Sequence, residues 1–424
     1  MGNCVCRGSE RNRVEKTSGE EMCRNRTKFK ATRNLRVFPR DEIVKKCHEG
    51  IIERNMSDSD KMGFSDQRRL CQKETVERGA IKRVENKSGW LLNGGSDLCM
   101  YIVTWNMNSK VACHDMLKLL GRKRGSFDFY VVGLQEAPHV DIASFIQKAL
   151  GRNYSMVRAA TMQSLRLYIF GRKSLDSLIR DVRVDKIKGG GLGGVVGRQK
   201  GAVAISFDFI NTSFIFISCH LAPHQSNVEE RNSQYQRISQ TIFSDSTSRM
   251  HSPCLQSPNR LTDPLGLKKE SKVISPTSLE TSDVVVWLGD LNYRIEGSRN
   301  SVGSLINQNF QQLRAKDQLS REAEKGEIFH GFCEGPLSFR PTYKYDIGTD
   351  DYDTSTKRRV PSWTDRILYK INSGGNVKAH VEDYDSIDSI KGSDHRPVKA
   401  HLCIKFRRPL VNHLQTTTSC SCMH

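Results

Sequence analysis

The feature of this chain that most limits its fold is a series of short hydrophobic runs, rich in β-branched and aromatic residues, between residues 99 and 406. Each run has the length of a β-strand, and several are apolar at nearly every position, which is typical of strands buried on both faces. Stretches with helical spacing separate some of them, so a layered α/β domain is predicted over 97–410. The predicted strands are 99–106, 127–136, 166–172, 202–210, 213–221, 283–292, 366–371 and 397–406, and the predicted helices are 114–120, 142–150, 227–242 and 305–325.

The segments outside this pattern differ in composition. Residues 1–96 are basic and show no sustained period, which predicts a largely disordered N-terminal arm. Residues 244–282 are rich in Ser, Pro and Thr, and we interpret them as a mobile insertion in the domain. Residues 411–424 are expected to form a C-terminal tail.

The charge of the chain favours polyanionic partners. Its 66 lysines and arginines outnumber 47 aspartates and glutamates, which gives a formal net charge of +19 over 424 residues. Nucleic acid, an acidic lipid surface and phosphorylated small molecules all suit such an excess, and charge alone does not choose among them.

Hydropathy and cysteine content exclude two other classes of protein. No apolar run approaches the roughly 18 residues that cross a bilayer, so an integral membrane protein is not expected. Thirteen cysteines are an odd number spread thinly over the chain. This argues against a secreted disulfide scaffold and predicts mostly reduced thiols in a cytosolic or nuclear protein.

Polar side chains gather at the ends of the predicted strands, where a site can be built. Taken singly, each has an ordinary explanation as a turn residue, the close of a strand or a buried histidine. Together, carboxylates, amides and imidazoles without a cysteine-rich motif favour a hard cation such as Mg²⁺, which would bridge a carboxylate and a phosphate oxygen. The pattern therefore predicts a metal-assisted hydrolase. These residues are Asn106, Glu136, His220, Asp290, Asn292, Asp365, Arg366, Asp394 and His395.

Two long segments carry a family resemblance. WLGDLNYRI (287–295) and VPSWTDRILYK (360–370) resemble the two signature motifs of the inositol polyphosphate 5-phosphatases, which belong to the endonuclease/exonuclease/phosphatase superfamily. In lacking WD repeats and in starting with MGNC, the chain resembles the plant type I enzymes. Six shorter matches follow the family order: TWNMN (104–108), GLQE (133–136), GGVVGRQKGAVAISF (193–207), SCHLAPH (218–224), RPTYKYD (340–346) and GSDHRPV (392–398).

The resemblance implies a DNase I-like fold, a four-layered α/β/β/α sandwich, and a set of metal and water contacts. Glu136 would be the main carboxylate ligand of Mg²⁺, assisted by Asn106. Asp290 and Asn292 would activate and orient the attacking water and contact the scissile phosphate. Asp394 would lie beside the metal and water.

It also implies contacts to the substrate phosphates. His395 would donate to a non-bridging phosphate oxygen, with Asp365 fixing its tautomer, and His220 would contact the 5-phosphate. A neighbouring 4-phosphate needs fixed cations around it. The resemblance assigns it to Tyr343, Lys344, Lys357 and Arg359, and it expects Arg366 near a substrate phosphate or as a buried partner of a site carboxylate.

The sequence departs from the family pattern in a few places. Residues 197–201 read GRQKG where many members have GNKG, so the length of this loop is expected to differ. Pro223 and Gln234 occupy positions where Ala and Asp are expected. None of these changes removes a proposed metal or phosphate residue.

These observations predict a Mg²⁺-dependent phosphatase that removes the 5-phosphate of phosphoinositides such as phosphatidylinositol 4,5-bisphosphate. Phosphatidylinositol 3,4,5-trisphosphate and soluble inositol polyphosphates are further candidate substrates. Two alternatives stay open: a nucleic-acid phosphodiesterase or endonuclease of the same superfamily, and a non-catalytic phosphoinositide-binding adaptor. The TYKYD and SWTDRIL segments favour an inositol head group over nucleic acid, and the complete set of ligands argues against an adaptor. No obligate protein partner is evident.

The N-terminus predicts a membrane contact for an otherwise cytoplasmic protein. Gly2 in MGNCVC resembles an N-myristoylation site, although the usual Ser or Thr at position 6 is missing, and Cys4 and Cys6 are placed for palmitoylation. One acyl chain anchors a protein only marginally, and the basic arm would supply the second attraction to a peripheral membrane surface.

Overall fold

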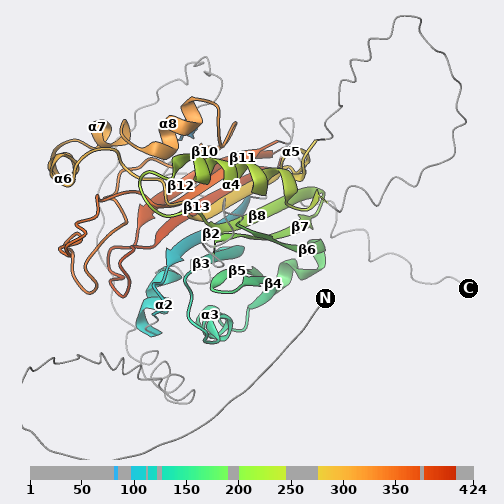
Figure 1. Ribbon diagram of the computed structural model, residues 1–424. Coiled ribbons are helices and arrows are strands. Elements are labelled where there is room, and N and C mark those ends of the chain that lie inside the picture. The colour runs from blue at the N-terminus through green and yellow to red at the C-terminus, as the bar shows by residue number, and fades with distance from the viewer. Residues whose placement is uncertain are drawn as a thin grey trace, which may run out of the picture. The chain divides into compact units, whose positions relative to one another are not determined.

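Two β-sheets stacked face to face form the centre of the protein (Figure 1). The computed structural model describes residues 81–84, 97–110, 113–121, 127–189, 200–244, 276–372 and 377–406. The first sheet has the strand order β1-β10-β11-β9-β8-β7-β6, and the second has the order β12-β13-β2-β3-β5-β4. The strands are β1 (Lys82–Arg83), β2 (Asp97–Asn106), β3 (Phe129–Gln135), β4 (Tyr154–Met162), β5 (Leu165–Arg172), β6 (Ile179–Lys188), β7 (Gly201–Phe209), β8 (Thr212–His220), β9 (Val284–Asp290), β10 (Cys333–Glu334), β11 (Asp365–Ile371), β12 (Val377–Ser386) and β13 (Val398–Phe406).

Helices cover both outer faces of the sheet pair, which gives four layers. One core lies between the sheets and takes side chains from both, including Phe129 and Phe216. A second core joins the first sheet to α4 and α8, and a third joins the second sheet to α2 and α3. This arrangement agrees with the predicted α/β/β/α sandwich. The helices are α2 (Cys113–Leu119), α3 (Ile142–Leu150), α4 (Val228–Thr241), α5 (Ser278–Thr281), α6 (Arg299–Gln308), α7 (Phe310–Arg314) and α8 (Gln318–Glu324), with a 3₁₀ turn η1 (Lys173–Leu178).

All eight predicted strands are present, and five further strands, β1, β4, β6, β10 and β12, were not predicted. β4, β6 and β12 lie at edges of the two sheets, where one side of each strand has no neighbouring strand. Exposed or half-buried residues interrupt all three strands, and β6 and β12 also carry many charged residues. They therefore lack the continuous apolar runs of central strands such as β3 and β9, whose seven residues are all buried.

The predicted helix over 305–325 is instead three short helices. Asn309 ends α6 and caps α7, because its side chain accepts the backbone N–H groups of Gln311 and Gln312. Asp317 then caps α8 by accepting the N–H of Ser320. Two interior N-caps break a pattern that reads as one helix from its apolar spacing alone.

The predicted domain boundaries need two corrections. Ile81 is buried and β1 pairs with β10, so residues 81–84 belong to the folded domain and not to a disordered arm. The end of the predicted insertion also folds, because Thr277 forms a capping box with Glu280 at the start of α5. Residues 1–80, 85–96, 245–275 and 407–424, and with them the predicted tail, lie outside the described residues.

One pair of cysteines departs from the expectation of reduced thiols. Cys99 on β2 and Cys403 on β13 are joined by a disulfide, whereas Cys219 and Cys333 are free. Among the residues that the structure describes, no helix combines the length and the apolar character that a membrane crossing requires.

Candidate active site

The predicted site residues meet where the two sheets bring strand ends together. Asp290 ends β9, the central strand between β8 and β11. In the register of the first sheet, Asp290 lies opposite His220 at the end of β8 and opposite Asp365 at the start of β11. Three predicted residues therefore share one row of this sheet.

Gly289 makes this close arrangement possible. Its φ is +144°, and a Cβ atom built on it would lie 2.0 Å from the carbonyl oxygen of Cys219. No other residue type fits there without moving β9 away from β8. The Gly of the GDLN sequence thus sets the position of the Asp that follows it.

A hydrogen bond joins the second sheet to this row. The Nδ2 group of Asn106, at the end of β2, donates to Oδ2 of Asp290 at 3.0 Å. Its Oδ1 atom accepts the backbone N–H of Asn108 at 3.1 Å. Asn106 is buried, so both bonds fix the orientation of its amide.

His395 is held by a carboxylate on the side away from Asp290. Its Nδ1 atom lies 2.8 Å from Oδ2 of Asp365, and its Nε2 atom lies 4.0 Å from Oδ2 of Asp290. Burial alone would lower the pKa of His395, but the charges of Asp365, Asp290 and Asp394 outweigh it and raise this pKa to about 10. His395 therefore carries a positive charge at neutral pH.

Asp290 stays ionised although it is fully buried. Burial raises its pKa, and the opposing effect of His220, His395 and Lys200 is larger, so the pKa lies well below its usual value. Nε2 of His220 is 3.2 Å from Oδ2 of Asp290, and Nζ of Lys200 contacts the same imidazole nitrogen. Burial lowers the pKa of Lys200, and Asp290 and Glu136 counter this effect.

Several residues around the site have left-handed backbone conformations. The φ angles of Asn108, Glu136, His224 and Asn292 are 47°, 49°, 77° and 58°. Non-glycine residues rarely adopt this conformation, and such residues cluster at functional sites because they aim side chains out of regular strands. Glu136 follows directly on the buried strand β3, and Asn292 lies two residues after Asp290, the carboxylate that ends β9.

These side chains line a hollow of about 400 Å³. Its oxygen donors include three carboxylates and two predicted amides, which are the ligands that a hard divalent cation prefers. The donor set therefore fits such an ion, with Glu136 and Asn106 as the ligands that the sequence analysis expects. The lining residues are Asn106, Asn108, Glu136, Lys200, His220, Pro223, Asp290, Asn292, Arg294, Tyr343, Asp394 and His395.

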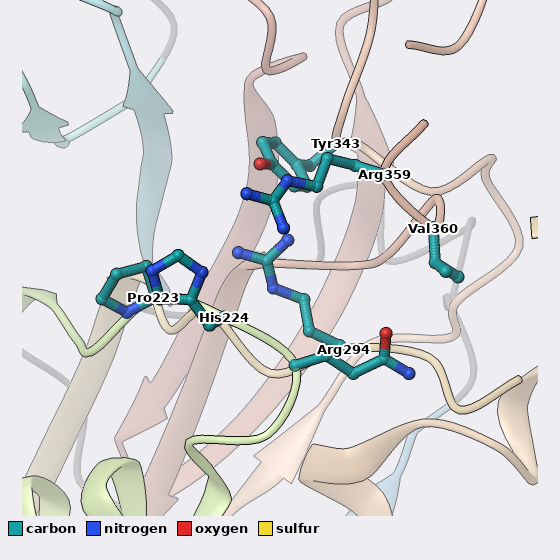
Figure 2. Close-up of a pocket in the computed structure, with 7 residues that line it drawn as sticks. Pro223, His224, Arg294, Tyr343, Arg359 and Val360 are labelled. Carbon is teal, nitrogen blue, oxygen red and sulfur yellow. The ribbon is translucent and has the colours of Figure 1, made fainter. Parts of the chain in front are cut away.

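A second hollow of about 390 Å³ adjoins the first and shares Pro223, Arg294 and Tyr343 with it. Figure 2 shows the guanidinium groups of Arg294 and Arg359 turned toward one another in this space. The guanidinium carbon of Arg294 lies 4.4 Å from the ring centre of Tyr343. Two neighbouring cations beside the first hollow suit an anionic group on the same ligand.

The remaining predicted substrate residues divide into two groups. Nζ of Lys344 lies 3.9 Å from Oδ2 of Asp394, and Lys357 is exposed in the loop that carries Arg359. Arg366, by contrast, is fully buried and pairs with Glu334 at 2.6 Å and Asp317 at 3.0 Å. The expectation that Arg366 meets a substrate phosphate or a site carboxylate is therefore wrong, because its donors are occupied on the far side of β11.

Two cationic residues of the site were missed in the sequence. Arg294 follows GDLN by two positions, and its Nη2 group donates to Oδ1 of Asn292 at 2.6 Å, so the first signature motif held the signal. Lys200 lies in the GRQKG segment that was noted only for its loop. The positive charge of Lys200, in a segment that matches the family, was the signal that could have identified it as a phosphate-binding residue.

The chain matches known proteins along most of the described domain. The profile of the Endonuclease/Exonuclease/phosphatase family 2 matches residues 103–401. A type IV inositol polyphosphate 5-phosphatase 11 of Arabidopsis thaliana is 41% identical over 79% of this chain and 91% of that protein. A phosphatidylinositol polyphosphate 5-phosphatase type IV of Mus musculus is 32% identical over 73% of this chain and 46% of the mouse protein.

A solved structure agrees with these matches. The inositol polyphosphate 5-phosphatase domain of SPsynaptojanin, in complex with inositol (1,4)-bisphosphate and a calcium ion, is 32% identical with a TM-score of 0.58. The match covers 73% of this chain and 86% of that one.

Two stacked sheets with carboxylates and imidazoles at their common edge define an enzyme fold of the endonuclease/exonuclease/phosphatase superfamily. Within it, the chain belongs to the inositol polyphosphate 5-phosphatases, a family of phosphoric monoester hydrolases. The family resemblance, the fold class and the plant relative are confirmed. The relatives named above are of type IV, whereas the sequence analysis expected type I.

Proposed function

We propose that the protein is a magnesium-dependent phosphatase that removes the 5-phosphate of phosphoinositides, with phosphatidylinositol 4,5-bisphosphate as the first candidate substrate. Phosphatidylinositol 3,4,5-trisphosphate and soluble inositol polyphosphates are further candidates. The observation that carries this proposal is the position of Asp290. It lies among Asn106, His220 and His395 in a hollow that shares lining residues with an arginine-lined one.

The residues around Asp290 suit direct attack by water. An ionised carboxylate can take a proton from a water molecule, and the amide of Asn292 lines the same hollow, held by the carbonyl oxygen of Leu221 and by Arg294. A charged His395 can donate to a phosphate oxygen as negative charge grows there. Asp365 keeps the proton on Nε2 of that imidazole available by occupying Nδ1.

Magnesium would supply the charge neutralisation that a phosphoester needs as it breaks. Glu136 and Asn106 would hold it, and Asp394 lines the same hollow. Calcium in the related synaptojanin domain supports a divalent cation in this family. The choice of magnesium rests on the all-oxygen donor set.

The adjoining hollow suits a second phosphate. Arg294, Arg359 and Tyr343 line it, and Lys344 and Lys357 lie on neighbouring segments. A 4,5-bisphosphate carries more charge than one divalent ion offsets, so these cations would hold the 4-phosphate while the 5-phosphate reacts.

The deciding experiment measures phosphate release from inositol lipids, soluble inositol phosphates and an abasic DNA duplex, with magnesium and with EDTA. We expect release from the 5-phosphorylated inositol compounds, loss of release with EDTA and no cleavage of the DNA. Cleavage of the duplex would favour the nuclease alternative. Binding of the lipids without release would favour the adaptor.

Matched variants test the residues. Asp290→Ala and His395→Ala should each reduce release by roughly 10²-fold or more, since general acid–base and electrostatic groups contribute this much. Asp208→Ala, at the outer end of β7, should retain full activity. Normal turnover in either site variant would refute the proposed chemistry.

The cellular location is a separate part of the proposal. Gly2 and Cys4 lie outside the described residues, and acylation there with the basic arm would hold the enzyme at its lipid substrate. A Gly2→Ala protein should shift from membrane to soluble fractions. An unchanged distribution would contradict the proposal.

A further inference from the structure

A cluster of metal-ligand side chains lies far from the active site, on β2, β12 and β13. His380 on β12 is directly opposite Cys403 on β13, and Cys403 is directly opposite Cys99 on β2. Because paired residues of neighbouring strands point to the same face of a sheet, these side chains form one row across three strands. The ligand atoms of His380, Glu382 and Cys403 all lie within 4.8 Å of one another.

Glu382 joins this row through an irregularity in the sheet. The register of β12 with β13 shifts between Val381 and Asp383, so Glu382 is the extra residue of a β-bulge. Bulges re-aim side chains, and here Oε1 of Glu382 comes to 3.6 Å from Nε2 of His380. The disulfide between Cys99 and Cys403 accounts for the two cysteines. The disulfide does not explain why β12 places the imidazole of His380 and the carboxylate of Glu382 beside these cysteines.

We propose that Cys99, Cys403, His380 and Glu382 form a structural site for a soft divalent cation, Zn²⁺ above all, when the two cysteines are reduced. Two thiolates, one imidazole and one carboxylate give the four ligands of a closed tetrahedral zinc site. Sulfur and nitrogen ligands select zinc over the magnesium that suits the oxygen-lined active site. The disulfide and the metal site are alternative states, because bonded sulfur atoms offer no thiolate.

The site would fasten together distant parts of the chain. Cys99 and Cys403 are 304 residues apart, and among the strands that the structure describes β12 pairs only with β13. Asn106 lies at the opposite end of β2 from Cys99, about 23 Å away at roughly 3.3 Å per residue. The metal would therefore stabilise the strands that carry the active site without touching the substrate.

The experiment uses the full-length protein, reduced with a phosphine, freed of metal and kept in excess magnesium to occupy the active site. Co²⁺ is the spectroscopic probe, and Zn²⁺ is the competitor. We expect one equivalent of Co²⁺ with thiolate charge-transfer absorption and the visible bands of a tetrahedral ion, displaced by Zn²⁺. Zn²⁺ should also raise the Tm of the reduced protein and leave that of the disulfide form unchanged.

Matched variants assign the ligands. Cys403→Ser, Cys99→Ser and His380→Gln should each weaken Co²⁺ binding at least about tenfold, since even second-shell changes weaken metal sites by 10- to 100-fold. Cys333→Ser removes a free thiol on β10 and should bind as the original protein does. No thiolate absorption in the reduced protein, or absorption that survives in Cys403→Ser, would overturn the proposal. So would a Cys99–Cys403 bond that the native protein retains under reduction. If the serine variants do not fold, the proposal is still tested by the unsubstituted protein. Its reduced form should bind Co²⁺ through thiolates and its disulfide form should not.

Discussion

The amide of Asn106 donates to the carboxylate of Asp290 at 3.0 Å, and this bond joins the ends of two strands that belong to different sheets. β2 and β9 are separated by more than 170 residues of chain, yet their terminal side chains touch because the two sheets stack with these ends together. The active site is therefore a product of the sheet packing. A change that shifts one sheet against the other should alter this bond before it alters either sheet.

The first prediction concerns this bond. Asn106→Ala should lower kcat/KM by roughly 10²-fold, because the amide orients Asp290 and also lies where a metal ligand is expected. It should also raise the magnesium concentration for half-maximal activity. Steady-state kinetics over a magnesium series measures both effects. Asn211→Ala, in the exposed turn between β7 and β8, is the control, and equal kinetics in the two variants would contradict the role of Asn106.

A second prediction follows from the charge on His395. Its pKa of about 10 in the folded protein exceeds the value of about 6.5 for an unfolded histidine. Protonation of His395 therefore stabilises the folded protein. This contribution to the free energy of unfolding is fully present below about pH 6.5 and is lost as the pH rises through about 10. Activity that needs the imidazolium should persist to alkaline pH and then fall. Asp365→Asn removes the opposing charge, so the alkaline limb of the pH–rate profile should move to lower pH.

The pH profile of Asp365→Asn distinguishes this role from a merely structural one. A loss of fold would lower activity at every pH without moving the limb. An Asp365→Asn enzyme with an unmoved alkaline limb would show that Asp365 does not control the charge of His395. Urea unfolding at neutral pH measures how much of the lost activity is due to a lower stability of the Asp365→Asn protein.

The central strands could be predicted from the sequence, because full burial demands apolar residues at every position. β3 and β9 satisfy this and were found. The edge strands β4, β6 and β12 could not be found this way, since one side of each is open and polar residues are allowed there. β1 has only two residues and is recognisable only from its pairing with β10.

The site divides in the same way. Glu136, Asp290 and His395 could be predicted because each follows or precedes a hydrophobic run within a recognisable motif. Arg366 could not be placed, because its neighbour Asp365 faces the site while alternation along β11 sends Arg366 to the other face. Its partners Asp317 and Glu334 come from segments with no motif, so only the folded structure reveals the pairing.

The buried charges around Arg366 give a third prediction. Arg366→Met should destabilise the protein by about 3–5 kcal/mol, because Glu334 and Asp317 would remain buried with less positive charge beside them. Arg83 also contacts Glu334 but is partly exposed, so Arg83→Met should cost less. Urea unfolding measures both, with Arg180→Met on the exposed side of β6 as the control. Equal stability of Arg366→Met and the control would contradict the charge argument.

A fourth prediction tests the close approach at Gly289. Gly289→Ala should cost more than about 2 kcal/mol and lower activity, because a Cβ atom cannot lie 2.0 Å from the carbonyl oxygen of Cys219 and β9 must move. Gly303→Ala is the matched control. Gly303 lies inside α6 with no atom within 4 Å of the added Cβ, so this change should stabilise the helix by up to about 1 kcal/mol. Equal Tm values of Gly289→Ala and Gly303→Ala in thermal unfolding would contradict the close approach of β9 to β8 at Gly289.

The last prediction separates the two hollows by substrate. Arg359 lines the second hollow, and its neighbour Arg358 is exposed, so the two arginines are a matched pair one residue apart. Loss of a charge-assisted hydrogen bond worth about 1.5–3 kcal/mol should raise KM for phosphatidylinositol 4,5-bisphosphate by roughly 10- to 100-fold in Arg359→Ala. The same variant should change the hydrolysis of a phosphatidylinositol 5-phosphate little, because that substrate has no 4-phosphate to hold. Arg358→Ala should behave as the original enzyme on both lipids. If Arg359→Ala loses as much on the monophosphate as on the bisphosphate, the second hollow does not bind the 4-phosphate, and Arg359 acts on the site as a whole.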